Sequence, residues 1–180
     1  MGNATVQRLS RPALVAALAG GVLLAGALPV AAAGPTASTA SAASAAYAKG
    51  TLGPFGYGGV KLGMSAKQAK ATGKIKRTGD TGTCTTWILK AHPNAQGLLI
   101  SKRYGVAAIF APKGVATPQG IRLGSTFKQL KKAYPKLKTA ASGYRYATIP
   151  GNPKAHYIFI LRNSKISQLG LVLNSQDCAN

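Results

Sequence analysis

The chain has 180 residues, of which 23 are lysine or arginine and only two are aspartate or glutamate, so its formal net charge at pH 7 is +21. With two carboxylate side chains, the chain has few groups for acid–base or metal chemistry, which argues against most hydrolases and metalloenzymes. A positive field of this strength attracts anionic partners and opposes the compact state through self-repulsion.

Residues 1–33 have the pattern of a secretory signal peptide. Two arginines precede an apolar run from Ala13 to Val30, and three alanines supply the small residues of a cleavage site before Gly34. A transmembrane anchor is the alternative, although the run is short for a span and is interrupted by glycines and a proline. We expect export with cleavage, and a secreted protein that is extracellular or associated with the cell wall.

Residues 34–50 are rich in alanine, serine and threonine, with too few large apolar groups to offset the entropy of ordering, and we expect a flexible stem. Beyond it, the segments Val60–Lys70 and Ile121–Lys131 share the pattern Leu-Gly-x-Ser/Thr-x-Lys-Gln-x-Lys. This repetition predicts two copies of one small unit, residues 51–119 and residues 120–180.

Each copy is predicted to begin with a short strand, a Leu-Gly turn and a helix. Ser65 with Gln68, and Thr126 with Gln129, have the spacing of a capping box, in which each side chain bonds to the backbone N–H of the other residue. The second helix has apolar residues at helical spacing on one face, whereas the first has alanine and glycine there.

Three strands are predicted to follow the helix in each copy, separated by turns rich in glycine, proline, asparagine and serine. They are Cys84–Lys90, Leu98–Arg103 and Val106–Phe110 in the first copy, and Tyr144–Ile149, His156–Leu161 and Ile166–Leu173 in the second. We therefore predict an α+β fold of two tandem repeats, each a short helical segment packed on antiparallel β-strands.

Cys84 and Cys178 are the only cysteines. In an exported chain the default is a single disulfide, which would close a long loop and constrain the unfolded state. Two free thiols are the alternative. A metal site is not predicted, because two cysteines and the distant His92 and His156 have no ligand spacing.

The stretch Gly63-Met64-Ser65-x-x-Gln68, followed by Cys84-Thr85-Thr86-Trp87, resembles the secreted β-lactamase inhibitor protein family. The same helix start occurs in small lipoproteins of the bacterial outer-membrane assembly machinery, and the layout of residues 51–180 is similar to that of uncharacterised secreted bacterial proteins. The resemblance implies tandem helix-on-sheet repeats, without catalysis, that bind a protein partner through an open sheet face.

The resemblance also implies that aromatic side chains make the contacts, and Trp87 matches a tryptophan of the family's binding surface. Two departures concern function: the family's partner cysteine is missing near Lys102, and the chain has only Asp80 and Asp177 to offer for the acidic side chain that the inhibitor inserts into its target. These departures argue against inhibition of a β-lactamase itself. The candidate sheet-face residues are Trp87, Tyr104, Tyr144, Tyr146 and Tyr157.

A second hypothesis comes from the lysines that recur on the predicted helices. Solvated helix surfaces normally mix both signs of charge, but acids are nearly absent here. These lysines predict electrostatic binding of an anionic cell-surface polymer or another polyanion, without the motifs of a sequence-specific nucleic-acid binder. They are Lys67, Lys70 and Lys74 in the first copy, and Lys128, Lys131 and Lys132 in the second.

An enzyme is the third hypothesis and the one that the sequence favours least. No nucleophile-elbow, phosphate-loop or zinc-protease motif is present, and we predict no cofactor. Asp80 and Asp177 are the only pair of carboxylates available for acid–base work, and their positions favour surface counter-charges over that role.

Overall fold

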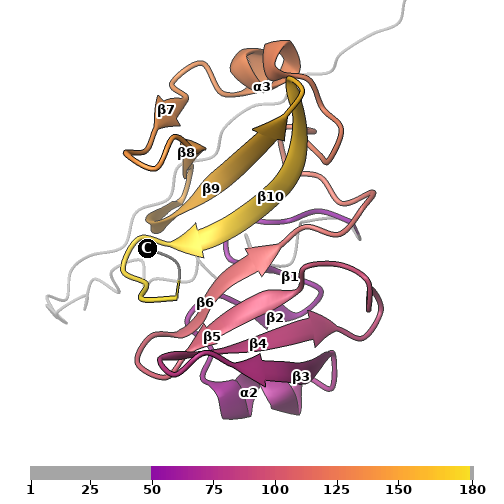
Figure 1. Ribbon diagram of the computed structural model, residues 1–180, viewed down its shortest axis with the longest axis vertical. Coiled ribbons are helices and arrows are strands. Elements are labelled where there is room, and N and C mark those ends of the chain that lie inside the picture. Colours follow the sequence, from indigo (N-terminus) through magenta and orange to yellow (C-terminus); the bar gives the residue numbers. More distant parts are fainter. Residues whose placement is uncertain (1–49, 179–180) are drawn as a thin grey trace, which may run out of the picture. The chain divides into compact units, whose positions relative to one another are not determined.

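The structure is a computed structural model that describes residues 50–178, so the predicted signal peptide and nearly all of the predicted stem lie outside the described residues. Eight strands form one antiparallel sheet in the order β3-β4-β5-β6-β10-β9-β8-β7, and β1 and β2 form a separate hairpin (Figure 1). The elements are β1 (Gly56–Tyr57), β2 (Val60–Lys61), α2 (Ala66–Ala71), β3 (Ile75–Asp80), β4 (Cys84–Leu89), β5 (Leu98–Ser101), β6 (Gly105–Phe110), α3 (Phe127–Ala133), β7 (Lys138–Thr139), β8 (Arg145–Ile149), β9 (Asn152–Arg162) and β10 (Lys165–Leu173).

The predicted fold class, an α+β pair of helix-on-sheet repeats, is wrong. The described residues are mostly β, with one large sheet and only two short helices. Each helix buries a single side chain, Ala69 in α2 and Leu130 in α3, so neither has an apolar face wide enough to cover the sheet. Irregular chain takes that place, with Leu52, Val115 and Ile121 among the residues of the core.

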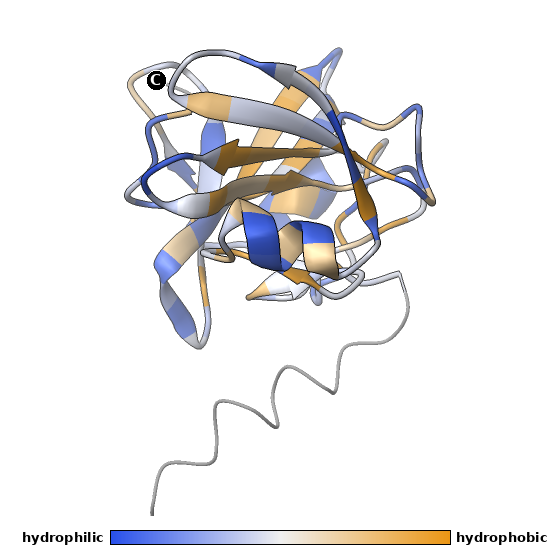
Figure 2. Cartoon of the chain, turned by 90° about the horizontal axis from the view of Figure 1, so that it is seen from below, coloured by the Kyte–Doolittle hydropathy of each residue, from blue (hydrophilic) through white to orange (hydrophobic). Residues whose placement is uncertain are grey.

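Both helices begin at the predicted capping boxes. Ser65 and Thr126 each accept a hydrogen bond from the backbone N–H of the glutamine three positions on, and each glutamine side chain accepts one from the backbone N–H of its cap. Figure 2, seen from the side of α2, shows hydrophilic turns of this helix beside hydrophobic strands. The helices are therefore local structures, stabilised at their N-termini and largely exposed.

The repeated Leu-Gly motif connects each helix to a strand of the sheet. The backbone N–H of Gly63 donates to the carbonyl of Val106, and the N–H of Val106 donates to the carbonyl of Met64. In the second motif Gly124 donates to Ile166, which donates to the residue after Gly124. A side chain at Gly105 would clash with the backbone of Gly63 and Met64, so glycine is required there for this close approach.

The six predicted strands are present, although β9 begins four residues before its predicted start, in a predicted turn, and β1, β7 and β3 were not predicted. Of these three, β3 is the longest. Its sequence, Ile75-Lys-Arg-Thr-Gly-Asp80, has one apolar residue, and it forms an edge of the sheet with a register irregularity between Arg77 and Gly79. Charged, bulged edge strands resist pairing with other chains, and they lack the hydrophobic alternation that identifies a strand in sequence.

The core is continuous across the sheet because residues directly opposite each other on neighbouring strands form rows. One row is Trp87, Leu98, Ile109, Leu171, Tyr157 and Ala147, which pair successively from β4 to β8. All six are buried. Tyr157 also donates a hydrogen bond of 2.8 Å to the carbonyl of Leu52, which fastens the segment before β1 onto the core.

The predicted disulfide between Cys84 and Cys178 is confirmed, and the two Cα atoms lie 5.5 Å apart. It links β4 to the chain after β10, so it joins the two halves of the sheet, which otherwise meet through the pairing of β6 with β10.

We predict that replacing either cysteine by serine destabilises the protein. The bridge closes a sequence separation of 94 residues, and the chain-entropy model assigns such a loop about 4–5 kcal/mol. The free energy of unfolding from urea titrations of the oxidised protein, with and without a reductant, measures this loss. The loss of unfolding free energy should be the same in Cys84→Ser, in Cys178→Ser and in the reduced wild type. An unchanged urea midpoint after reduction would contradict the expectation.

Tyr134 supplies a pH prediction for the core. Its ring is packed 5.3 Å from the ring of Phe159, centroid to centroid, its hydroxyl donates to Gln119, and burial raises its pKa from 10.0 to about 12. Because the folded pKa lies above the unfolded one, the neutral phenol stabilises the fold fully below pH 10, and this contribution is lost as the pH rises toward 12.

Tyr134→Phe should therefore remove part of the fall in unfolding free energy between pH 10 and 12. Urea titrations at several alkaline pH values measure it, with Tyr144→Phe as the control because Tyr144 is 47% exposed. If the unfolding free energy fell equally at alkaline pH in the wild type and in both variants, Tyr134 would not be the group responsible for the fall.

Candidate functional site

The sheet has one covered face and one open face, because alternate residues of a strand point to opposite sides. Ile109 and Leu171 lie opposite each other in β6 and β10 and belong to the main core. Their neighbours Ala108 and Val172 also lie opposite each other but belong to a separate, small cluster on the other side. We call this other side the open face.

The open face has a band of apolar side chains that crosses most of the sheet. Phe110 covers Gly170, where an added Cβ would lie 3.1 Å from its ring and 3.0 Å from Ile158. Most side chains of the band are half-buried and therefore partly exposed. Those at its centre are buried by close packing. It consists of Ile88, Leu99, Ala108, Phe110, Tyr146, Ile158, Ile160 and Val172.

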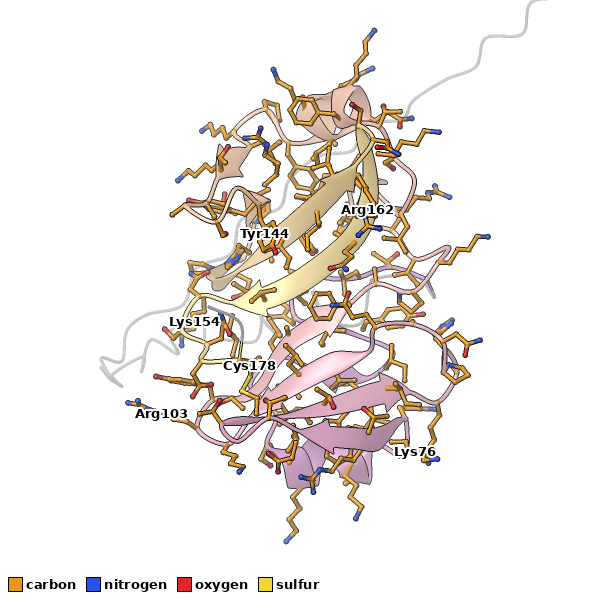
Figure 3. All side chains as sticks on the ribbon, viewed as in Figure 1. Lys76, Arg103, Tyr144, Lys154, Arg162 and Cys178 are labelled. Carbon is orange, nitrogen blue, oxygen red and sulfur yellow. A yellow bond between two sulfur atoms is a disulfide. The ribbon has the colours of Figure 1, made fainter. Side chains whose placement is uncertain are left out.

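Basic side chains surround this band on the same face. The register places one opposite Ile88 in β3, one opposite Tyr146 in β7, and one at each end of the alternating row in β9. All are exposed, and Figure 3 shows three of them along the margin of the sheet. This basic rim consists of Lys76, Lys138, Lys154 and Arg162.

One end of the open face is bounded by residues 174–178. This segment leaves β10 and reaches Cys84 in β4, so it passes β6 and β5 on the open side. Asn174 anchors its start through hydrogen bonds of 2.8 Å to His156 and to the carbonyl of Pro153. The disulfide therefore holds a short wall at the edge of the apolar band.

The five predicted aromatic contacts separate into two groups. Trp87 is only 7% exposed and Tyr157 only 1%, so both belong to the core and neither presents its ring to a partner. Tyr146 lies on the open face with its ring 5.5 Å from that of His156, and Tyr144 is the exposed residue just before β8. Tyr104 lies in the turn before β6, under the guanidinium of the adjacent arginine.

The six predicted helix lysines are all exposed but do not form one surface. Lys67 and Lys70 of α2, with Lys74 beyond the end of the helix, lie beside β3 at one end of the sheet, and those of α3 lie beside the β9–β10 turn at the other (Figure 1). Lys131 lies 5.8 Å from the centre of the Phe127 ring, and Arg145 lies 5.7 Å from it. Any polyanion would therefore meet two separate lysine groups.

The two carboxylates, Asp80 and Asp177, have different surroundings. Asp80 pairs with Arg77 and Lys102 at the β3–β4 turn, and a backbone hydrogen bond from Gly82, with these two cations, lowers its pKa. Asp177 lies 3.5 Å from the sulfur of Cys84. Neither arrangement places a second titratable group where it would form an acid–base pair.

Sequence reasoning missed the open-face band, although its residues lie in predicted strands, and it missed the basic rim, of which Lys76 and Lys138 lie in the unpredicted strands β3 and β7. The alternation in β9, Lys154-x-His156-x-Ile158-x-Ile160-x-Arg162, could have revealed a face that is basic at its ends and apolar between them. The sequence did not show which of the two faces would be covered, since both carry large apolar residues.

Cys84, Asp177 and Cys178 form the one group of potential metal ligands found among residues 50–178, but the two sulfurs are joined to each other, which removes the thiolates that a metal would need. In the same part of the chain, no helix has the length and apolar character needed to cross a membrane.

Comparisons with protein-family models, with curated proteins and with solved structures find no significant match. The resemblance to the β-lactamase inhibitor protein family therefore stays a hypothesis that rests on the residues quoted above.

We predict that the single tryptophan reports a buried environment. Trp87 is enclosed, and its indole N–H donates 2.8 Å to the hydroxyl of Thr85, so its fluorescence should be blue-shifted in the folded protein and weakly quenched by iodide. Unfolding in urea should shift the emission to the red and increase quenching severalfold. Equal quenching before and after unfolding would place the ring at the surface instead.

Proposed function

We propose that the protein is a secreted, non-catalytic binding module that holds an extracellular protein against the open face. The observation that carries this proposal is the apolar band, which borders the short wall of residues 174–178 and is framed by the basic rim. Partly exposed apolar patches with a polar margin mark interaction surfaces on small proteins.

The composition of this face favours a protein over a polymer. A polyanion such as a nucleic acid or a wall polymer would engage the four rim cations but leave side chains such as Ile158 and Ile160 without an apolar partner. An acidic protein surface with a few protruding apolar side chains satisfies both parts of the face, because charge complementarity orients the partner and apolar burial supplies affinity.

Inhibition of an extracellular enzyme is one form that this function would take. Two features support export: the signal-peptide pattern in residues 1–33 and a disulfide, which persists in oxidising compartments. The absence of a paired acid–base group around Asp80 and Asp177 supports binding without catalysis.

The alternative is an electrostatic binder of cell-surface or other polyanions. The observation in its favour is that the six predicted helix lysines are exposed, while two carboxylates cannot neutralise 23 cationic side chains. Their separation at the two ends of the sheet predicts weak, strongly salt-dependent attachment without a single defined site.

The test begins with the purified protein as bait for the secreted proteins of the producing organism, at low and high salt. The partner is then titrated against three proteins by surface plasmon resonance. These are the wild type, an open-face variant (Ile88→Ser with Tyr146→Ser) and a helix variant (Lys67, Lys70, Lys128 and Lys131, each changed to Gln). Both residues of the open-face variant are half-buried, so circular dichroism and melting verify that it folds.

We expect the open-face variant to bind at least about tenfold more weakly, because it removes two large apolar side chains of the band, and the helix variant to stay within about threefold of the wild type. Two results together would reject the open face in favour of the polyanion hypothesis. The helix variant alone would lose binding, and the wild type would be retained on heparin at low salt but not at high salt. Full binding by both variants would reject both.

A further inference from the structure

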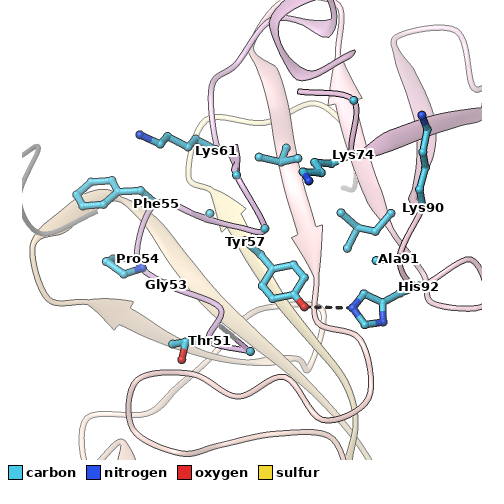
Figure 4. A pocket seen from close by; sticks show the side chains of 17 residues that line it. Thr51, Gly53, Pro54, Phe55, Tyr57, Lys61, Lys74, Lys90, Ala91 and His92 are labelled. Carbon is cyan, nitrogen blue, oxygen red and sulfur yellow. Dashed lines mark hydrogen bonds between the residues drawn. The ribbon is translucent and has the colours of Figure 1, made fainter. Parts of the chain in front are cut away.

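A pocket of about 790 Å³ lies beside the β1–β2 hairpin, away from the residues of the open face (Figure 4). Three stretches line it: residues 50–61, which include the hairpin, Gly73 and Lys74 after α2, and residues 89–92 at the end of β4. This volume is in the range of sites that bind small molecules.

The charged groups of the pocket all have the same sign. Lys61, Lys74 and Lys90 come from three separate segments and all line it, whereas neither Asp80 nor Asp177 does. Figure 4 shows Lys61 on one side and the other two lysines on the opposite side. Cations around a pocket without a counter-charge raise the local concentration of anions, and the low-dielectric walls of a cavity strengthen this effect.

A tyrosine–histidine pair supplies the neutral polar groups of the pocket. The Tyr57 hydroxyl lies 3.2 Å from Nε2 of His92, and this contact joins the hairpin to the loop after β4. Burial raises the pKa of Tyr57, so its phenol is protonated at physiological pH. Nδ1 of His92 is the second polar atom of this ring.

The remaining lining is apolar. Pro54, Val60 and Leu89 are buried beneath the pocket, and the ring of Phe55 is half-buried at its side. A bare inorganic anion would leave the partly exposed ring of Phe55 in contact with water, whereas an uncharged apolar molecule would leave the three lysines without a counter-charge.

We propose that this pocket binds a small amphipathic anion, with a carboxylate or phosphate head group and a short hydrocarbon body. The head group is held on the side of Lys74 and Lys90, the body packs against Phe55 and Pro54, and Lys61 adds positive charge from the opposite side of the pocket. This site is independent of the open face, and each can exist without the other.

Isothermal titration calorimetry of the exported, purified protein tests the ligand class with four probes: octanoate, octyl phosphate, 1-octanol and inorganic phosphate. We expect octanoate or octyl phosphate to bind at least about tenfold more tightly than octanol and than inorganic phosphate, since charge and apolar contact both contribute. Preference between the two anions identifies the head group. Equal binding of octanol, equal binding of inorganic phosphate, or no binding of either octyl anion would overturn the proposal.

A matched pair of variants tests the location. Lys61→Gln, Lys74→Gln and Lys90→Gln together should weaken binding of the preferred anion about tenfold. The control has the same net charge but alters the exposed Lys113, Lys128 and Lys136, which do not line the pocket, and it should bind like the wild type. Equal weakening in the two variants would assign binding to the overall positive field and would overturn the site.

Discussion

The antiparallel pairing of β6 with β10 is the interaction on which the rest of this structure depends. It joins β3–β6 to β7–β10. Without it, β6 and β10 would each be an unpaired edge strand. Through this pairing Ile109 lies opposite Leu171, so the row of buried side chains passes from one half to the other. The disulfide reinforces the same junction from the chain end.

The repulsion among the many positive charges opposes the folding of this single sheet. Nearly all of the cations lie on turns, helix surfaces and the ends of strands, where water screens their repulsion, and Asp80 neutralises part of the cluster at the β3–β4 turn. The buried rows and the disulfide offset the remaining repulsion. Positive charge is therefore spread over the surface, and part of it borders the open face and the hairpin pocket.

Local sequence was a good guide wherever the cause was local. The capping boxes at Ser65 and Thr126 follow from side chains three residues apart, and the six predicted strands follow from short apolar runs between turn residues. The prediction for the cysteines was correct because a chain with two of them allows one intramolecular pairing. The predicted helix-on-sheet layers were wrong because the length of a capped segment does not reveal how much apolar surface it will bury.

The sequence by itself determined where the helices start, where most strands run, which cysteines pair and that the surface is basic, since each depends on residue type or on neighbours along the chain. Only the tertiary structure decided that Trp87 and Tyr157 are core residues while Tyr146 is on the open face. A strand alternates between two sides, but its own residues do not specify which side other segments will cover. Segments distant in sequence, such as residues 50–64, make that choice, and with it they select the open face and form the pocket.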